Sequence, residues 1–164
     1  MRRLEKSSQS VVPMFLKFIA LGTIFCCALA TNSIVYRLHN AKPILRPQFA
    51  ELRFSETWCS GRSDRSLLAR LVSANHILWV AVTKDTLHVS PHIPFNLMFF
   101  AEGFGWDHRV PGRTILEIRE SEKNSLGTRV AIRYRHRTGA EELLELSVAD
   151  GPGLLKALHE IQPR

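Results

Sequence analysis

The sequence predicts a mainly β domain of seven antiparallel strands and one C-terminal helix, preceded by a single transmembrane helix. An apolar run near the N-terminus is long enough to cross a bilayer, strand patterns dominate after residue 76, and an amphipathic stretch ends the chain. The 164 residues are 45% hydrophobic and 23% charged. This length and composition suit one globular domain beside the membrane segment.

The apolar run at residues 11–36 is the predicted transmembrane helix. Twenty helical residues extend about 30 Å, which matches the hydrocarbon thickness of a bilayer. Lys17 would be costly at the bilayer centre, so the span fits best at Phe18–Tyr36, where the ammonium group can reach the headgroups. Tyr36 and the following Arg37 are an aromatic and a basic residue, the pair typical of a membrane–water interface. We expect a single-pass protein of the cell membrane.

A cleaved signal peptide ending at residue 30 is the alternative interpretation. A basic start precedes the apolar core, and Ala28-Leu29-Ala30 is a small-residue cleavage site before Thr31. The product would be a secreted or periplasmic soluble domain acting as a protein-binding scaffold. Basic residues flank the segment on both sides, so the positive-inside rule gives no orientation.

The sequence signals for secondary structure are weak just after the membrane segment. Phe49–Glu56 fits a strand, and the turn-forming residues of Trp58–Asp64 predict a turn after it. Asp64 is placed to cap a short helix over Arg65–Leu71, whose leucines share one face.

Strand signals are clearer in the middle of the chain, where β-branched and aromatic residues recur. Four segments carry them: Ile77–Thr83, Thr86–Ser90, Trp106–Val110 and Thr114–Glu120. Tight turns are expected at Lys84-Asp85 and Pro111-Gly112. In the last strand, Leu116 and Ile118 are expected to point inward and Ile115 outward.

The best-marked element is a hairpin of Thr128–Arg137 and Glu141–Val148. In both strands the even positions are apolar and the odd positions carry most of the charge, so even residues must lie opposite even residues. A three-residue loop, Thr138-Gly139-Ala140, satisfies this condition and places Tyr134 opposite Leu144. The arginines of the odd positions are then expected to form cross-strand ion pairs with glutamates of the return strand.

A helix is expected to end the chain. Asp150 is a helix cap, and Pro152 suits the first turn. Its apolar stripe consists of Leu154, Leu155, Leu158 and Ile161. The predicted organisation is a polar tail (1–10), the transmembrane helix (11–36), a linker (37–48) and the β domain (49–164).

Two groups of residues carry a family resemblance. Leu78–Thr83 with Leu87 and Val89, and His108–Pro111 leading into Thr114–Ile118, are similar to strands of bacterial pleckstrin-homology and GRAM-type domains. With the final helix, the chain resembles the pleckstrin-homology-like superfold. That resemblance implies a seven-stranded antiparallel barrel with one open end plugged by the helix. The chain departs from it in an extra segment at Trp58–Ala74 and a long loop at Pro91–Gly105.

The residues that could carry chemistry form no recognised catalytic or metal-binding pattern. His88 and His92 lack the helical spacing of a zinc protease, and Cys59 has no second cysteine at ligand spacing. Asp107 and His108, with Glu102 nearby, are the only acid–base candidates. We therefore expect a non-enzymatic protein without metal or cofactor.

The formal net charge of +7 favours an anionic partner. A tethered domain always has a membrane within reach, whereas no nucleic-acid-reading motif is present. The expected lipid or partner surface combines arginines with an apolar loop: Arg62, Arg65, Arg70, Phe95, Phe99, Phe100, Arg109 and Arg113. The predicted function is a membrane-anchored interaction module that binds an anionic lipid surface or a membrane-protein partner. The oligomeric state is left open.

Overall fold

The computed structural model describes residues 5–39, 49–66, 70, 73–93, 95, 105–124 and 127–163. The chain forms two compact units, the N-terminal helix and the β domain. Helix α1 (Glu5–His39) is unbroken, and its segment Met14–His39 is long and apolar enough to cross a membrane. A single apolar helix near the N-terminus is compatible with a single-pass anchor or with a signal sequence. Of the expected interface pair, Tyr36 is exposed and Arg37 is buried.

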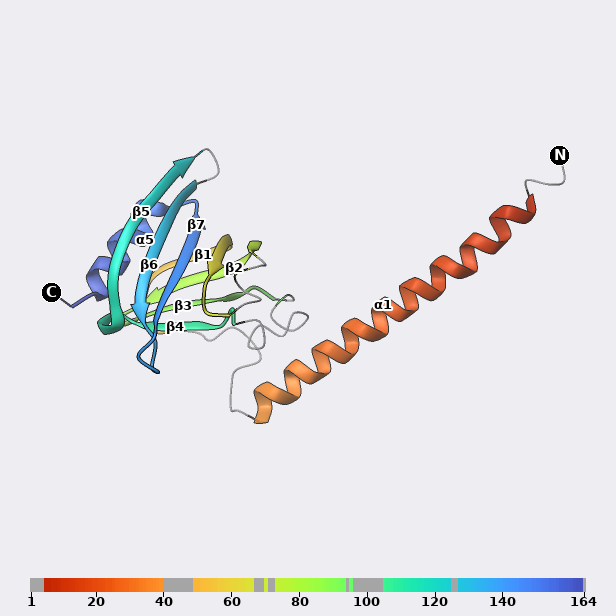
Figure 1. Cartoon of the computed structure of the whole chain (residues 1–164), viewed down its shortest axis with the longest axis horizontal. Coiled ribbons are helices and arrows are strands. Elements are labelled where there is room, and N and C mark those ends of the chain that lie inside the picture. The colour runs from red at the N-terminus through yellow and green to blue at the C-terminus, as the bar shows by residue number, and fades with distance from the viewer. Residues whose placement is uncertain are drawn as a thin grey trace. The chain divides into compact units, whose positions relative to one another are not determined.

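The β domain is one antiparallel sheet of seven strands followed by helix α5 (Gly151–Ile161) (Figure 1). The sheet order is β4-β3-β2-β1-β7-β6-β5. The strands are β1 (Leu52–Ser63), β2 (Ala74–Thr83), β3 (Thr86–Pro91), β4 (His108–Pro111), β5 (Ile115–Asn124), β6 (Gly127–Arg135) and β7 (Glu141–Val148). The predicted fold class, mainly β with one C-terminal helix, is confirmed.

The predicted barrel is not closed within the described part of the chain, because β4 and β5 are the two ends of the sheet. Strand β4 has only four residues, and the 3₁₀ turn Gly112–Thr114 leads the chain away from it into β5. In Figure 1, β2, β3 and β4 run across the view while β5, β6 and β7 run steeply up it. Strand β1 pairs with both halves of the sheet.

The predicted turn at Trp58–Asp64 is wrong, because β1 continues through these residues to Ser63. Its first part pairs with β2, and Ser60–Ser63 pairs with β7. A Cβ atom at Gly61 would lie 2.8 Å from a methyl group of Leu78. A small residue in β1 is therefore needed at this point, because β1 and β2 approach each other closely where the sheet bends.

Asp64, the predicted helix cap, bonds to β7. The Asp64 carboxylate accepts a hydrogen bond from the Leu143 amide at 2.7 Å, across to β7. The Arg70 amide donates to the Ser66 carbonyl, which is one helical turn. The rest of the short helix expected there lies outside the described residues.

The hairpin of β6 and β7 has the predicted inward faces but a register shifted by two residues. Arg135 lies opposite Glu141, and Ile132 lies opposite Leu144. The loop spans five residues and closes through the His136 amide, which donates to the Ala140 carbonyl at 2.8 Å. Parity permits loops of three or five residues, so alternation alone could not select between them.

The arginine row of β6 pairs mainly with β5 rather than with β7. Arg133 forms an ion pair with Glu117, and Arg129 lies 3.3 Å from Glu122. Within the hairpin itself, Arg135 and Glu141 lie 3.8 Å apart. Because the register is shifted by two residues, the other arginines of β6 do not lie opposite the glutamates predicted for them.

The inward face of β5 also differs from the prediction. Ile115 is buried and Leu116 is 41% exposed, whereas Ile118 packs against the core as expected. A register irregularity between Ile115 and Glu117 changes the alternation, so residues three apart point to the same side.

The predicted C-terminal helix is confirmed with its cap and its apolar stripe. The Asp150 carboxylate accepts from the Gly153 amide at 2.9 Å. Glu56, on β1, accepts from the backbone amides of Ala149 and Asp150 and fixes the approach to the helix. The helix buries Leu154, Ala157, Leu158 and Ile161 in the core formed by the sheet.

Candidate functional site

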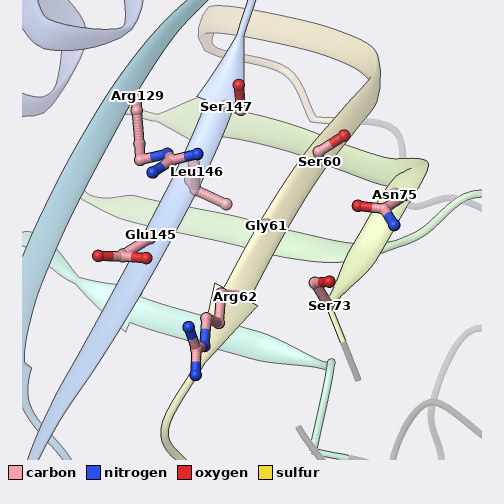
Figure 2. Close-up of a pocket in the computed structure, with 9 residues that line it drawn as sticks. All are labelled: Ser60, Gly61, Arg62, Ser73, Asn75, Arg129, Glu145, Leu146 and Ser147. Atoms are coloured by element: carbon pink, nitrogen blue, oxygen red, sulfur yellow. The ribbon is translucent and has the colours of Figure 1, made fainter. Parts of the chain in front are cut away.

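A polar pocket of about 250 Å³ lies where β1 passes from one half of the sheet to the other. We call it the corner pocket (Figure 2). It is lined by Ser60, Gly61, Arg62, Ser73, Asn75, Arg129, Glu145, Leu146 and Ser147. Its volume lies below the roughly 300–1,000 Å³ of sites for drug-sized ligands, so it suits a small chemical group.

Two residues with left-handed backbone conformations shape this corner. Trp58 has φ 64° and His76 has φ 51°, values that are uncommon for residues other than glycine. They are joined across β1 and β2, because His76 Nδ1 lies 3.2 Å from the Trp58 carbonyl oxygen. The His76 amide also donates to the Ser60 hydroxyl at 3.0 Å. Strained non-glycine residues of this kind are concentrated at functional sites.

The strain coincides with an uneven pairing of the two strands. From Cys59 to Gly61 strand β1 advances two residues, while β2 covers the four from Leu78 to Ala74. The extra residues of β2 bulge out of the ladder and bring Asn75 to the pocket. The corner pocket therefore arises from the bulge.

Strand register explains how the polar side chains of the pocket converge. Ser60, Ser147 and Arg129 lie in one row across β1, β7 and β6. In the next row, Arg62 lies opposite Glu145. In Figure 2 the Glu145 carboxylate lies between the guanidinium groups of Arg62 and Arg129.

Hydrogen-bond donors outnumber anionic groups in the pocket. Within the described part of the chain, the side chain of Arg62 has no hydrogen bond or ion pair, while that of Arg129 pairs with Glu122. The Ser60 hydroxyl accepts from His76 and retains its proton to donate. Among the described residues, Glu145 is the one carboxylate that lines the pocket. The arrangement suits an anionic ligand.

An exposed aromatic side chain stands at the same corner. The Trp58 ring is 54% exposed and stacks on His92 with ring centroids 4.9 Å apart. The other tryptophans, Trp79 and Trp106, are each 5% exposed. A tryptophan with an apolar body and a polar N–H is well suited to a membrane–water interface.

The structure disperses the arginines predicted from the sequence. Arg62 lies in the corner pocket, whereas Arg113 lines a separate hollow beside the end of α5. Arg65 donates to the Asp107 carbonyl at 2.8 Å, and Arg70 donates to a backbone carbonyl at 3.0 Å. Arg109 is exposed on β4. Only one of the five therefore belongs to the pocket.

The predicted apolar loop lies largely outside the described residues. Phe95 is half-buried, and Phe99 and Phe100 are not described. The pocket instead uses Arg129, Ser147, Ser73 and Asn75, which the sequence interpretation missed. Their convergence depends on the pairing of β1 with β7, which joins residues more than 80 positions apart in the chain. The sequence carries no local signal for this pairing.

Of the acid–base candidates, His108 belongs to a buried hydrogen-bond network. His108 is 1% exposed, and its Nδ1 lies 2.9 Å from the Tyr134 hydroxyl, which donates to Glu142. Burial, with help from the Arg65 charge, lowers the pKa of His108 to about 3. Its imidazole is therefore neutral and weakly basic at physiological pH. Glu102, the third candidate, lies outside the described residues.

The buried cysteine is also poorly suited to chemistry. Burial and the neighbouring Glu56 carboxylate raise the pKa of Cys59 to about 12, so its thiol stays protonated at neutral pH. No group of three or more histidine, cysteine or acidic residues in the described part of the chain is placed to hold a metal ion.

Comparison with protein-family models and with curated proteins finds no match for this chain.

Proposed function

We propose that this chain is a membrane-anchored, non-catalytic interaction module whose corner pocket binds anionic groups at the lipid surface. The observation that carries the proposal is the pocket itself: donors from four strands converge beside an exposed tryptophan. Arginine at an anionic surface contributes about 1 kcal/mol per residue. The domain fold behind the pocket is proposed to be pleckstrin-homology-like, which the antiparallel sheet order and the terminal helix support.

The length of the tether supports a role at the membrane. Ten Cα–Cα steps separate His39, the last residue of α1, from Phe49 at the start of the domain. A fully extended chain of that length spans at most about 35 Å. The apolar segment Met14–His39 is long enough to cross a membrane, and we propose that it is a retained anchor. A retained anchor keeps the pocket within reach of lipid headgroups.

A protein partner is the second candidate, favoured by the outer edge of β5. This strand forms one end of the sheet in the described part of the chain, and an extended peptide can add to such an edge. Charged residues along β5, including Glu117, Arg119 and Glu122, are the kind that protect edges from unwanted pairing. The lipid proposal is therefore preferred.

Tryptophan fluorescence of the full chain in nanodiscs tests the proposal. We expect the emission to shift to shorter wavelength when phosphatidylcholine is partly replaced by phosphatidylglycerol, because Trp58 enters the interface. The shift should disappear at high salt, which screens surface charge. The W58F variant should show no shift, since Trp79 and Trp106 are buried. Identical wild-type spectra in neutral and anionic nanodiscs at low salt would refute the proposal.

Arginine variants locate the contact on the protein. R62Q combined with R129Q should abolish the shift caused by anionic lipid. R135Q is the matched control, because Arg135 lies on the same strand as Arg129 and also has one exposed ion-pair partner. An equal loss in both variants would indicate a nonspecific charge effect and would argue against the corner pocket.

A further inference from the structure

We propose that the group held by the corner pocket is a singly charged phosphate that keeps a P–OH, either a monoprotonated phosphomonoester or dihydrogen phosphate. This inference rests on the proposed anion-binding role of the pocket and names the chemical class of its ligand. The observation behind it is the Glu145 carboxylate, which lines a pocket otherwise supplied with hydrogen-bond donors.

The carboxylate sets a condition on the ligand. Ionised Glu145 can only accept hydrogen bonds, so a fully deprotonated anion would place negative charge against it without a compensating bond. A monoprotonated phosphate satisfies both kinds of group. Its P–OH donates to Glu145, and its remaining oxygens accept from Arg62, Arg129 and the serine hydroxyls. A phosphomonoester has its second pKa near 6, so this form is well populated in weakly acidic to neutral solution.

Strand geometry places the donors around one small group. Residues directly opposite each other in an antiparallel pair have Cβ atoms about 5 Å apart, so Ser60, Ser147 and Arg129 form a short row across three strands. Arg62 lies two residues along β1 from Ser60, on the same face. Ser60, Ser147 and Arg129 thus approach from one row, and Arg62 and Glu145 from the next.

The charged residues that line the pocket sum to one positive charge. Arg62 and Arg129 supply two positive charges against one negative charge on Glu145. Glu122 on β5 faces Arg129 at 3.3 Å and partly neutralises it. On the β2 side, the titratable neighbour is His76, which is held by hydrogen bonds to Trp58 and Ser60. A singly charged anion matches this balance better than a doubly charged one.

Comparison of phosphate with sulfate tests the inference, because sulfate has similar size but no proton at this pH. The full chain in neutral detergent micelles is titrated calorimetrically with each anion at pH 6. We expect phosphate to bind at least tenfold more tightly than sulfate. E145Q should bring the two affinities within about threefold, because the amide can donate to sulfate. R62Q should weaken phosphate binding tenfold or more, and R135Q should leave it unchanged.

Several outcomes would overturn the inference. Equal affinities for phosphate and sulfate in the wild type, no measurable phosphate binding, or unchanged selectivity in E145Q would each do so. Wild-type tryptophan emission confirms that each variant is folded. Phosphatidylglycerol is a phosphodiester without an ionisable P–OH, so the nanodisc experiment can succeed while this one fails. The two results are therefore separable.

An experiment in nanodiscs distinguishes a lipid-borne phosphate from a soluble one. If the ligand is lipid-borne, phosphatidic acid should shift Trp58 emission more than phosphatidylglycerol does at equal surface charge. If the ligand is soluble, the two lipids should act alike, and added inorganic phosphate should still bind the chain in micelles. Both outcomes support a phosphate site and assign it to a lipid or to a soluble ligand.

Discussion

Lowering the pH from 6.5 to 5 is expected to reduce the free energy of unfolding of the domain by up to about 1.4 kcal/mol per pH unit through His108 alone. The pKa of this imidazole falls from 6.5 to about 3 on folding, because burial disfavours the charged form. Between those two values the unfolded chain binds a proton that the folded chain does not. The stability due to the neutral imidazole is therefore complete above pH 6.5 and declines as the pH falls.

Denaturant unfolding of the detergent-solubilised chain, followed by emission of the buried tryptophans, measures this dependence. The H108F variant should flatten the slope between pH 6.5 and 5, whatever its stability at pH 7. His88 contributes in the same direction, since burial lowers its pKa as well, so some slope should remain. The exposed His159 provides a control, and H159Q should keep the wild-type slope. A slope in H108F equal to that of the wild type would contradict the account of the buried network.

Replacing Leu158 with alanine is expected to destabilise the domain by about 2–5 kcal/mol. Its side chain is fully buried in the core between α5 and the sheet. The substitution removes apolar contacts and leaves a cavity that a helix fixed by the Asp150 cap and by Glu56 cannot close fully. The loss should appear as a lower denaturant midpoint with an unchanged slope.

Lys156 offers a matched control on the same helix. Its side chain is exposed, and alanine is a favourable helix former. K156A should therefore change the stability by less than about 0.5 kcal/mol. Comparable losses in K156A and L158A would mean that the helix is not docked through its apolar stripe.

Local patterns predicted the elements of this fold, and long-range pairing decided the details that they missed. The apolar stripe and cap of α5 and the alternation of β6 were readable because each depends on residues a few positions apart. The course of β1 was not readable, because its serines and Gly61 are suited both to turns and to a close strand crossing. The irregularity between Ile115 and Glu117 turns Ile115 inward and Leu116 outward, and the sequence pattern carries no sign of it.

The residues of the candidate site were even harder to predict from local patterns. Charge and type singled out Arg62, but its companions in the pocket come from strands that meet only in the folded sheet. Arg129 was interpreted as one member of an ion-pair row facing the return strand, whereas its partner is Glu122 on β5. The strained pair Trp58 and His76 left no trace in composition or spacing, since backbone strain results from tertiary packing.

Brominated phospholipids show whether Trp58 touches the membrane, because bromine quenches only tryptophans that contact the lipid. In anionic nanodiscs made with brominated lipid, the wild type should lose the emission of Trp58. A W58F/L116W variant moves the exposed tryptophan to the outer face of β5, where Leu116 is exposed, and should not be quenched. If the corner pocket faces the membrane, only the wild type is quenched. Equal quenching of both proteins, or stronger quenching at position 116, would contradict the account.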